Sequence, residues 1–283
     1  MSIAVLGSGS WGTALALLLG RNGHEVLLMG RDEEEIASIR SLRENLRYLP
    51  GFALPETVHA QMLDEPTDGV KAWIIAVPAN AVGSVLGHIH NDTPLVVVAS
   101  KGLEPSTGDL LSHVVAQHVP NATVGAISGP NLAVELARGI PTAAVAACPD
   151  ETVAERIALL FNCRTFRAYV SDDRTGVELA GALKNVLALS AGMSDGLGFG
   201  DNTKGALVAR GLYEITKLGT AMGAKLETFF GIAGVGDLFA TANSTLSRNY
   251  RVGRFLGEGL GLEAALERVG QVAEGVPTAH AAV

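Results

Sequence analysis

The N-terminal stretch of the chain, residues 3–29, most constrains what it can fold into. An apolar run at residues 3–6 predicts a buried strand, and Gly7-Ser8-Gly9-Ser10-Trp11-Gly12 follows it directly. Residues 13–19 then show the apolar pattern of a helix, and residues 25–29 predict a second strand. This order of strand, G-x-G-x-x-G, helix and strand is the fingerprint of a dinucleotide-binding βαβ unit.

Each glycine of the fingerprint has a role in binding a dinucleotide. Gly7 permits the tight turn, Gly9 lets the backbone approach a pyrophosphate, and Gly12 lets the helix pack closely on the strand. The pyrophosphate then lies at the helix N-terminus, where free N–H groups and the helix dipole favour an anion. The alternative is that the glycines serve only a tight turn. Their position between a strand and a helix favours a nucleotide cofactor.

Size and composition exclude several classes of protein. The 283 residues suffice for two modest domains, and a net charge of −8 does not favour nucleic acid, so a phosphorylated ligand needs local positive groups. No apolar run reaches the ~18 residues of a membrane span. Cys148 and Cys163 are too few for a disulfide framework. We expect both as small buried residues of a cytoplasmic protein.

Strand and helix patterns alternate up to about residue 170 and then stop alternating. The alternation favours a mostly parallel sheet covered by helices on both faces. Beyond residue 171 the patterns are helical only, with long helices predicted at 174–193 and 203–223. We therefore predict an α/β, Rossmann-like dinucleotide-binding domain at residues 1–170. An all-α substrate and catalytic domain follows at residues 171–283.

The end of the second strand bears on the choice of cofactor. The strand continues into Gly30-Arg31-Asp32, and an arginine at this point accommodates the 2′-phosphate of NADPH, whereas an acidic residue binds the ribose hydroxyls of NADH. Arg31 therefore favours NADPH, with NADH also possible. The alternative is that Arg31 and Asp32 only begin the acidic helix that follows.

Two lysines stand where a ligand can meet them. Lys101 follows the apolar strand predicted at residues 95–99, and ligands of doubly wound sheets bind beyond such strand ends. Lys184 lies within an almost entirely apolar helix that has no carboxylate at helical spacing from it. A buried ammonium without a partner is strongly destabilising, or its pKa falls until it is neutral. Lys184 therefore has a partner from elsewhere, reaches solvent, or faces a cleft, where it can act as a general acid or base.

Two C-terminal segments add polar groups. Residues 231–238 predict a flexible turn that delivers one carboxylate, Asp237. Ser247-Arg248-Asn249 predicts the start of a helix capped by a hydroxyl, and a cation in a first helical turn opposes the helix dipole unless an anion is bound there. Arginine and asparagine donors at a helix N-terminus suit a phosphate. An ordinary capped surface helix is the alternative.

Taken together, these stretches resemble the bacterial-type NAD(P)-dependent glycerol-3-phosphate dehydrogenases along essentially the whole chain. The order and spacing of the motifs are specific, although no single motif is. The matching stretches are GSGSWGTALA (7–16), SKGLE (100–104), SGPNLAVE (128–135), LKNVLA (183–188), DGLGFGDNTKGALVARGL (195–212), GVGDL (234–238), SRN (247–249) and EGVPTA (274–279).

The resemblance implies a role for each matching position and no metal site. Lys184 is expected to transfer the proton, with Asn185, Asp237 and Lys101 as catalytic neighbours. Asn131 stands where the family often has serine or threonine. The expected cofactor contacts are Gly7, Gly9, Ser10, Trp11, Gly12, Arg31, Lys101, Ala133, Arg248, Val272 and Glu274. The expected substrate contacts are Lys101, Gly129, Asn131, Lys184, Asp237, Ser247, Arg248 and Asn249.

The resemblance further implies hydride transfer between NAD(P)H and dihydroxyacetone phosphate, giving sn-glycerol 3-phosphate for glycerophospholipid synthesis. It also implies a homodimer, and a helical domain that is short at its C-terminus. Two alternatives stay open at this point. One is a related two-domain NADPH-dependent hydroxy-acid or keto-acid reductase; the other is a non-catalytic NADPH-binding sensor.

Overall fold

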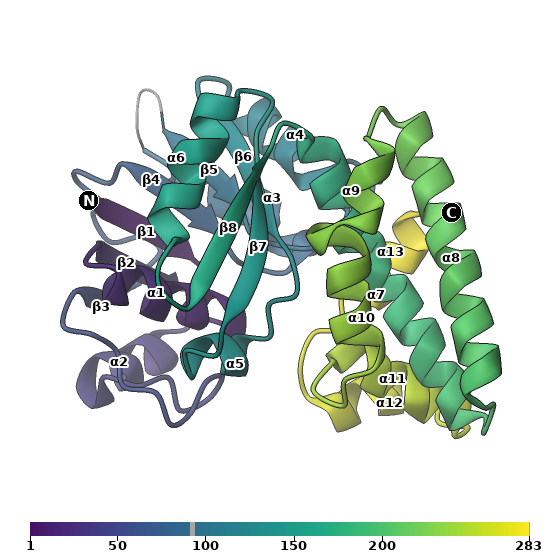
Figure 1. Ribbon diagram of the computed structural model, residues 1–283. Helices are drawn as coiled ribbons and strands as arrows, with labels where there is room; N and C mark the ends of the chain where they lie inside the picture. Colours follow the sequence, from purple (N-terminus) through teal and green to yellow (C-terminus); the bar gives the residue numbers. More distant parts are fainter. Residues whose placement is uncertain (91–93, 283) are drawn as a thin grey trace. The chain divides into compact units, whose positions relative to one another are not determined.

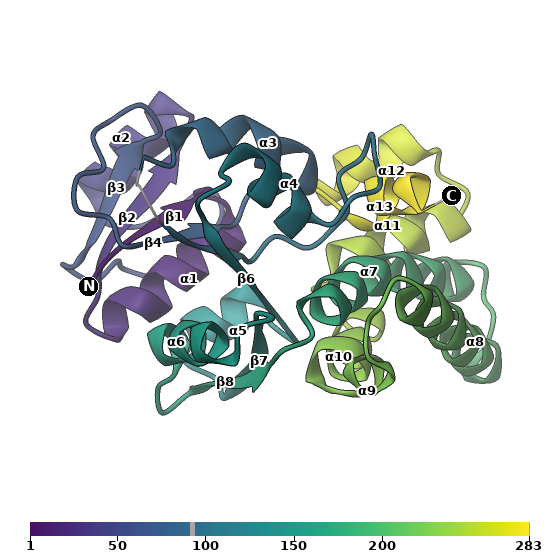
Figure 2. The same ribbon diagram turned by 90° about the horizontal axis from the view of Figure 1, so that it is seen from above.

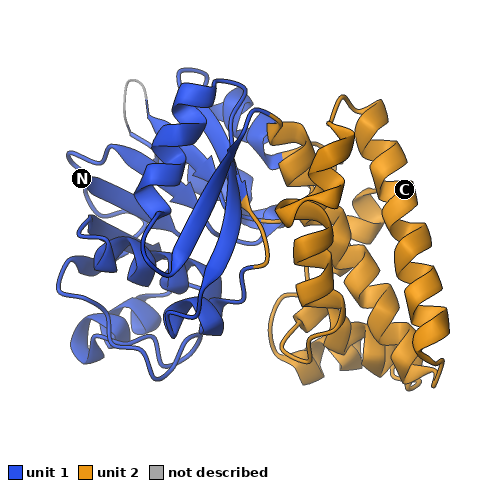
Figure 3. Cartoon of the chain, viewed as in Figure 1, with its two compact units in different colours: residues 1–100, 111–127, 131–172 blue, residues 101–110, 128–130, 173–283 orange. Residues whose placement is uncertain are grey.

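The structure is a computed structural model that describes residues 1–90 and 94–282. The chain forms two compact units (Figure 3). The first comprises residues 1–100, 111–127 and 131–172, and the second comprises residues 101–110, 128–130 and 173–283. Two short segments that follow strands of the sheet, at Lys101 and at Gly129, therefore belong to the same unit as the C-terminal helices.

The first unit is built on an eight-stranded sheet with the order β3-β2-β1-β4-β5-β6-β7-β8. Each pair from β3 to β6 is parallel, and β7 pairs in parallel with β8. The chain order reverses beside β1, which lies between β2 and β4, and this switch point is where such sheets bind ligands. The strands are β1 (Ser2–Leu6), β2 (Glu25–Gly30), β3 (Val58–Met62), β4 (Ala72–Ile75), β5 (Leu95–Val98), β6 (Thr123–Ser128), β7 (Thr142–Ala147) and β8 (Phe166–Ser171).

Helices cover both faces of this sheet (Figure 2). In β1, Ile3 and Val5 belong to the core under α1 and α6, while Ala4 and Leu6 belong to the core under α3 and α4. Because both faces are buried, the strand is a continuous apolar run rather than an alternating one. The helices of this unit are α1 (Ser10–Arg21), α2 (Glu33–Leu42), α3 (Val82–Val85), α4 (Leu111–His118), α5 (Ala133–Ala137) and α6 (Glu151–Phe161).

The second unit is helical and packs around α7 (Figure 1). This helix has buried residues on all sides, as its apolar sequence predicts, and α8, α10, α11 and α13 contact it. The elements are α7 (Arg174–Gly196), α8 (Asp201–Ala221), α9 (Leu226–Phe230), the π-helical segment η3 (Ile232–Gly236), α10 (Asp237–Ala242), α11 (Arg248–Gly257), α12 (Leu262–Val269) and α13 (Gly275–Ala281).

The predicted fold class is confirmed: a mostly parallel sheet is followed by helices, and the described residues after β8 contain no strand. Four details differ. Strand β3 was not predicted, because an edge strand with the polar residues His59 and Gln61 lacks the apolar run of the central strands. Residues 231–238 are helical rather than a flexible turn. The sequence also predicts a loop at residues 271–277, but α13 already begins at Gly275. Cys163 is exposed, although Cys148 is buried as expected.

None of the helices within the described part of the chain has the length and apolar character needed to cross a membrane.

Candidate active site

Two of the three fingerprint glycines are required by the packing of the first unit itself. Gly7 has a φ of +117°, and a Cβ atom on it would lie 2.6 Å from the carbonyl oxygen of Ala76. A Cβ atom on Gly12 would lie 1.8 Å from the carbonyl oxygen of Gly7. Any side chain at either position would therefore open the tight turn between β1 and α1.

Gly9 is different, and it distinguishes a nucleotide site from a simple turn. Its φ of −68° and ψ of −180° are open to any residue, and a Cβ atom on it would meet no atom within 4 Å. The protein's own packing therefore does not explain a glycine here. Gly9 is the N-cap of α1 and no side chain caps that helix. A bare, uncapped helix N-terminus fits the close approach of a pyrophosphate.

The sequence predicts residues 40–54 only as irregular, whereas α2 extends to Leu42. The remainder of this segment, residues 43–54, supports the turn. Asn45 is fully buried, and its Nδ2 donates to the carbonyl oxygen of Ser8 at 2.7 Å and to Oγ1 of Thr13 at 2.9 Å. Oγ of Ser10 donates to the carbonyl oxygen of Tyr48 at 2.7 Å. These bonds fix the loop before α1. Sequence reasoning missed Asn45 because its partners are far from it along the chain.

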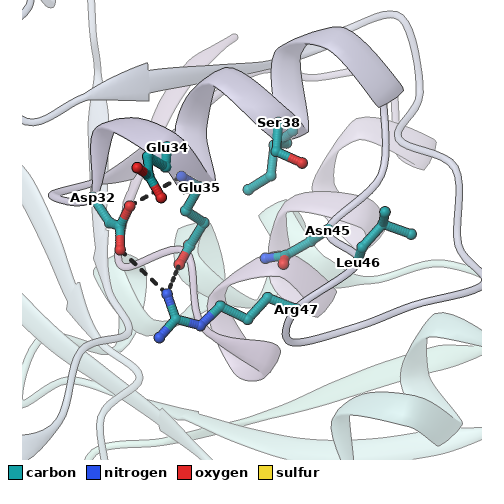
Figure 4. A pocket seen from close by; sticks show the side chains of 8 residues that line it. Asp32, Glu34, Glu35, Ser38, Asn45, Leu46 and Arg47 are labelled. Carbon is teal, nitrogen blue, oxygen red and sulfur yellow. Dashed lines mark hydrogen bonds and ion pairs between the residues drawn. The ribbon is translucent and has the colours of Figure 1, made fainter.

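At the end of β2, the adjacent residues Arg31 and Asp32 have different structural roles. Asp32 is the N-cap of α2, and its Oδ1 accepts a hydrogen bond from the Glu35 N–H at 3.0 Å. Arg47 pairs with Asp32 at 3.2 Å and with Glu35 at 3.7 Å (Figure 4). Asp32 thus begins the acidic helix, as the alternative interpretation held, while Arg31 remains exposed at the strand end. Arg47 and its partners line a cavity of about 360 Å³ together with Glu34, Ser38, Ile39, Asn45 and Leu46.

Trp11 and Asn131 are fixed by hydrogen bonds within the first unit. Nε1 of Trp11 donates to the carbonyl oxygen of Ala99 at 2.9 Å. Nδ2 of Asn131 donates to the carbonyl oxygen of Ala143 at 3.0 Å, whereas its Oδ1 is buried and has no hydrogen-bond partner among the described residues. Such an orphaned oxygen is rare in proteins and suits a ligand hydroxyl as donor. Ala133 is the first residue of α5, close after Asn131 in sequence.

The second unit brings three of the predicted catalytic residues together around one carboxylate. Nζ of Lys184 donates to Oδ1 of Asp237 at 2.9 Å, and Nζ of Lys101 donates to Oδ2 of Asp237 at 2.6 Å. Nζ of Lys101 also donates to the carbonyl oxygen of Gly129 at 2.8 Å. Of the alternatives that the sequence left open for the buried Lys184, the structure shows a partner from elsewhere in the chain, Asp237. We call Lys184, Asp237 and Lys101 the lysine–aspartate cluster.

The electrostatics of this cluster follow from its burial and its charges. Burial lowers the pKa of Lys184 to about 8; Asp237 opposes this shift, while Lys101 and Arg248 add to it. Burial alone would raise the pKa of Asp237, but the charges of Lys101 and Lys184 outweigh it and hold that pKa below its usual value. The cluster at neutral pH thus has two cations around one anion. It can stabilise a negative charge and release a proton near physiological pH.

Thr241 is part of the same cluster and was missed in the sequence. Its Oγ1 accepts a hydrogen bond from Nζ of Lys184 at 2.6 Å and donates to the carbonyl oxygen of Asp237 at 2.7 Å. The segment η3 leads directly into α10, whose first residue is Asp237. Thr241 lies one helical turn later on the same face. That spacing of carboxylate and hydroxyl is the signal that could have found it.

The N-terminus of α11 forms as predicted, with Ser247 as its cap. Oγ of Ser247 accepts a hydrogen bond from the Tyr250 N–H at 3.3 Å, and Arg248 occupies the first helical position. Burial lowers the pKa of Arg248, and the nearby Glu274 opposes that shift. A partly desolvated arginine beside a helix N-terminus is a site for an oxyanion.

Asn249 joins three helices. Its Nδ2 donates to Oδ1 of Asn185 on α7 at 2.9 Å, and its Oδ1 accepts from the backbone N–H of Gly275 on α13 at 2.8 Å. The amide is therefore already engaged with protein groups, and its bonds hold α11 against α7 and α13. Glu274 stands at the start of α13, and Val272 is exposed in the loop before it.

The chain is similar to known proteins in both sequence and structure. Models of the N-terminal and C-terminal parts of NAD-dependent glycerol-3-phosphate dehydrogenase match residues 2–154 and 173–283. The glycerol-3-phosphate dehydrogenase [NAD(P)+] of Pseudomonas fluorescens is 48% identical over 279 residues, which cover 98% of this chain and 82% of that protein. The enzyme of the same name from Geobacillus kaustophilus is 47% identical over 288 residues, covering 99% and 84%.

The crystal structure of glycerol-3-phosphate dehydrogenase from Coxiella burnetii superimposes with a TM-score of 0.95 at 38% identity, covering 99% of this chain and 87% of that one. Sequence and structure therefore agree along the whole chain, which belongs to the family of NAD-dependent glycerol-3-phosphate dehydrogenases.

Proposed function

We propose that this chain interconverts dihydroxyacetone phosphate and sn-glycerol 3-phosphate by hydride transfer with NADPH or NADH, and so feeds glycerophospholipid synthesis. The observation that carries the proposal is the lysine–aspartate cluster, in which Lys184 combines burial, a pKa of about 8 and a shared carboxylate. Family membership supports this activity over a hydroxy-acid reductase or a non-catalytic sensor.

The cofactor is proposed to bind at the fingerprint turn of the first unit. The bare N-terminus of α1 and the open space at Gly9 support a pyrophosphate there, with Ser10, Trp11 and Ala133 as further contacts. Arg31 would hold the 2′-phosphate of NADPH. When bound, the nicotinamide supplies the hydride in reduction and takes it up in oxidation. Lys101, Arg248, Val272 and Glu274 are proposed as cofactor contacts from the second unit.

In the reducing direction, negative charge grows on the C2 oxygen of the substrate as its carbonyl carbon receives the hydride. Lys184, as an ammonium, stabilises that charge and donates its proton to the oxygen, which completes the alcohol. Asp237 and Thr241 hold the amine in place, and Lys101 supplies a second positive charge. In the oxidising direction, neutral Lys184 accepts the hydroxyl proton.

The substrate's phosphate is proposed to lie at the N-terminus of α11, held by Ser247, Arg248 and Asn249. Gly129 and Asn131 would contact the rest of the substrate, and the orphaned Oδ1 of Asn131 supports a bond from a substrate hydroxyl. Asn185 is proposed as a catalytic neighbour of Lys184. Residues 1–170 and 171–283 are proposed as the cofactor domain and the substrate domain. We further propose that the protein is a homodimer of the cytoplasm, as the family resemblance implies.

The activity is tested by following oxidation of NADPH and of NADH by the purified protein. Dihydroxyacetone phosphate should support rapid oxidation, whereas dihydroxyacetone and simple keto acids, which lack the phosphate, should support little. Equal or faster turnover of keto acids would instead identify a hydroxy-acid reductase. Cofactor binding without turnover of any of these compounds would identify a sensor.

The pH dependence of the rate should differ between the two directions. Reduction needs the ammonium form of Lys184, so its rate should fall as the pH rises through about 8, where that group loses its proton. Oxidation needs the neutral amine, so its rate should rise over the same range. Initial rates measured from pH 6 to 10 in both directions, with saturating substrates, show whether the two rates change in opposite directions with pH. Parallel profiles in the two directions would contradict the role of Lys184.

Substituting Arg248→Ala should raise the KM for dihydroxyacetone phosphate much more than the KM for NADPH. Hydrogen bonds to charged groups contribute about 1.5–3 kcal/mol, which corresponds to a rise of roughly 10- to 150-fold. Arg251→Ala, in the same helix but outside the SRN motif, is the matched control and should change the KM for the phosphorylated substrate far less. Equal increases in both KM values for Arg248→Ala would argue against a phosphate role.

A further inference from the structure

Helices α7 and α11 cross at four glycines, two on each helix. A Cβ atom on Gly192 would lie 2.0 Å from the carbonyl oxygen of Tyr250, and one on Gly196 would lie 2.2 Å from that of Arg254. On the other helix, a Cβ atom on Gly253 would lie 1.9 Å from the carbonyl oxygen of Leu189, and one on Gly257 would lie 2.4 Å from that of Met193. The two backbones therefore touch directly, without side chains between them.

The residue numbers of the contacting pairs increase together along the two helices. Asn185 bonds Asn249, Leu189 meets Gly253, and Gly196 meets Gly257. The helices therefore run in the same direction, and the first turn of α11 is held beside the turn of α7 that carries Lys184. Because backbone atoms are in contact, no side chain lies between the helices that could change rotamer to accommodate added volume.

Hydrogen bonds fix the crossing along its length. At the site, Nδ2 of Asn249 donates to Oδ1 of Asn185 at 2.9 Å. Farther along α7, the Tyr250 hydroxyl donates to Oδ2 of Asp195 at 2.6 Å, and Nζ of Lys204 donates to the same oxygen at 3.0 Å. Sliding or rotation of α11 on α7 would break these bonds as well as the glycine contacts.

We propose that the glycine crossing sets the distance between the proton donor Lys184 and the phosphate-binding N-terminus of α11, and that Gly192 and Gly253 are thereby positioning residues for a three-carbon phosphoester. This inference rests on the proposed function, because it needs the substrate's carbonyl at Lys184 and its phosphate at Arg248. A methyl group at either glycine must push the helices apart by more than 1 Å to reach ordinary contact distance. Misplacement of that size costs on the order of 100-fold in rate.

The test compares Gly192→Ala and Gly253→Ala with Gly205→Ala. Gly205 lies in α8, is exposed, and a Cβ atom on it would meet nothing within 4 Å, so its substitution introduces a methyl without a clash. We expect kcat/KM for dihydroxyacetone phosphate to fall about 100-fold in the first two variants and to be unchanged in the third. The slow turnover of dihydroxyacetone, which has no phosphate to be placed, should change little in all three.

A second readout is independent of the overall rate. Because Arg248 contributes to the lowered pKa of Lys184, moving α11 away should shift the pH profile of reduction toward higher pH. Loss of activity through unfolding alone would lower both substrates' rates together and leave that profile unmoved. Thermal denaturation of each variant checks that it is folded.

Tyr250→Phe keeps the ring and removes only the hydrogen bond to Asp195. It therefore tests the same proposal if the alanine variants fail to fold. It should lower kcat/KM for dihydroxyacetone phosphate several-fold while sparing dihydroxyacetone. Folded variants that keep the parent's ratio of the two kcat/KM values, or that lose both equally, would overturn the proposal. A parent protein that does not reduce dihydroxyacetone phosphate would instead contradict the proposed function, so the two failures are distinguishable.

Discussion

Replacing Lys184 with alanine should lower kcat for dihydroxyacetone phosphate reduction by about 10⁴-fold and leave NADPH binding intact. General acid catalysis contributes roughly 10²- to 10⁴-fold, and loss of one charged donor to a developing oxyanion contributes roughly 10²- to 10³-fold. Alanine removes both contributions because the same amine provides them. The proposed nucleotide contacts of the first unit are untouched, so the cofactor should bind as before.

Steady-state kinetics measures the first effect, and quenching of protein fluorescence by NADPH measures the second. Lys217→Ala is the control, because Lys217 is an exposed lysine on α8 of the same unit. It should match the parent in both measurements. Nearly normal turnover in Lys184→Ala would remove Lys184 from the chemistry, and loss of NADPH binding would show that the change is not confined to proton transfer.

Replacing Asp237 with asparagine should give the largest loss of stability. The variant keeps the shape of the side chain but leaves Lys184 buried and Lys101 largely buried without their carboxylate. Removing one partner of a buried ion pair costs about 3–5 kcal/mol, so the free energy of unfolding should fall by that amount at neutral pH. Reduction of dihydroxyacetone phosphate should also fall, because the amine of Lys184 loses the group that orients it.

The loss of stability in Asp237→Asn should become smaller as the pH rises, because proton binding is linked to folding. The native pKa of Lys184 is below its unfolded value, and without Asp237 it falls further. The unfolded chain then binds more protons than the native one, so the stability of the variant rises with pH from below 8 towards 10.5. Urea denaturation at several pH values measures this.

Asp201→Asn, at an exposed carboxylate that pairs with Lys204 at 3.6 Å, is the control for the Asp237 variant. It should change the free energy of unfolding by less than about 1 kcal/mol. A similarly small change for Asp237→Asn would mean that the lysine–aspartate cluster is not stabilised by its carboxylate.

The features that sequence predicted well are those in which one local pattern has one structural solution. The turn at Gly7 to Gly12, the buried helix that carries Lys184 and the Ser247 cap formed as expected, because each depends on neighbours in the chain. A distant partner was one of three alternatives that the apolar surroundings of Lys184 left open, and Asp237 is that partner.

Two of the misses depend on contacts between segments that are distant in sequence. Asn45 and Thr241 are ordinary polar residues until folding places them against Ser8 and Lys184. The π-helical η3 was mistaken for a flexible turn, because its glycines signal a break in local structure. In the fold, a Cβ atom on Gly234 would lie 2.0 Å from the carbonyl oxygen of Phe229, so the glycine permits close packing instead.

The inclusion of residues 101–110 and 128–130 in the helical unit has a consequence for protein engineering. Lys101, Gly129, Lys184 and Asp237 all belong to one compact unit, and hydrogen bonds within that unit connect them. Arg31 belongs to the other unit, so we expect substitutions around this proposed 2′-phosphate contact to change the coenzyme preference and to leave these hydrogen bonds in place.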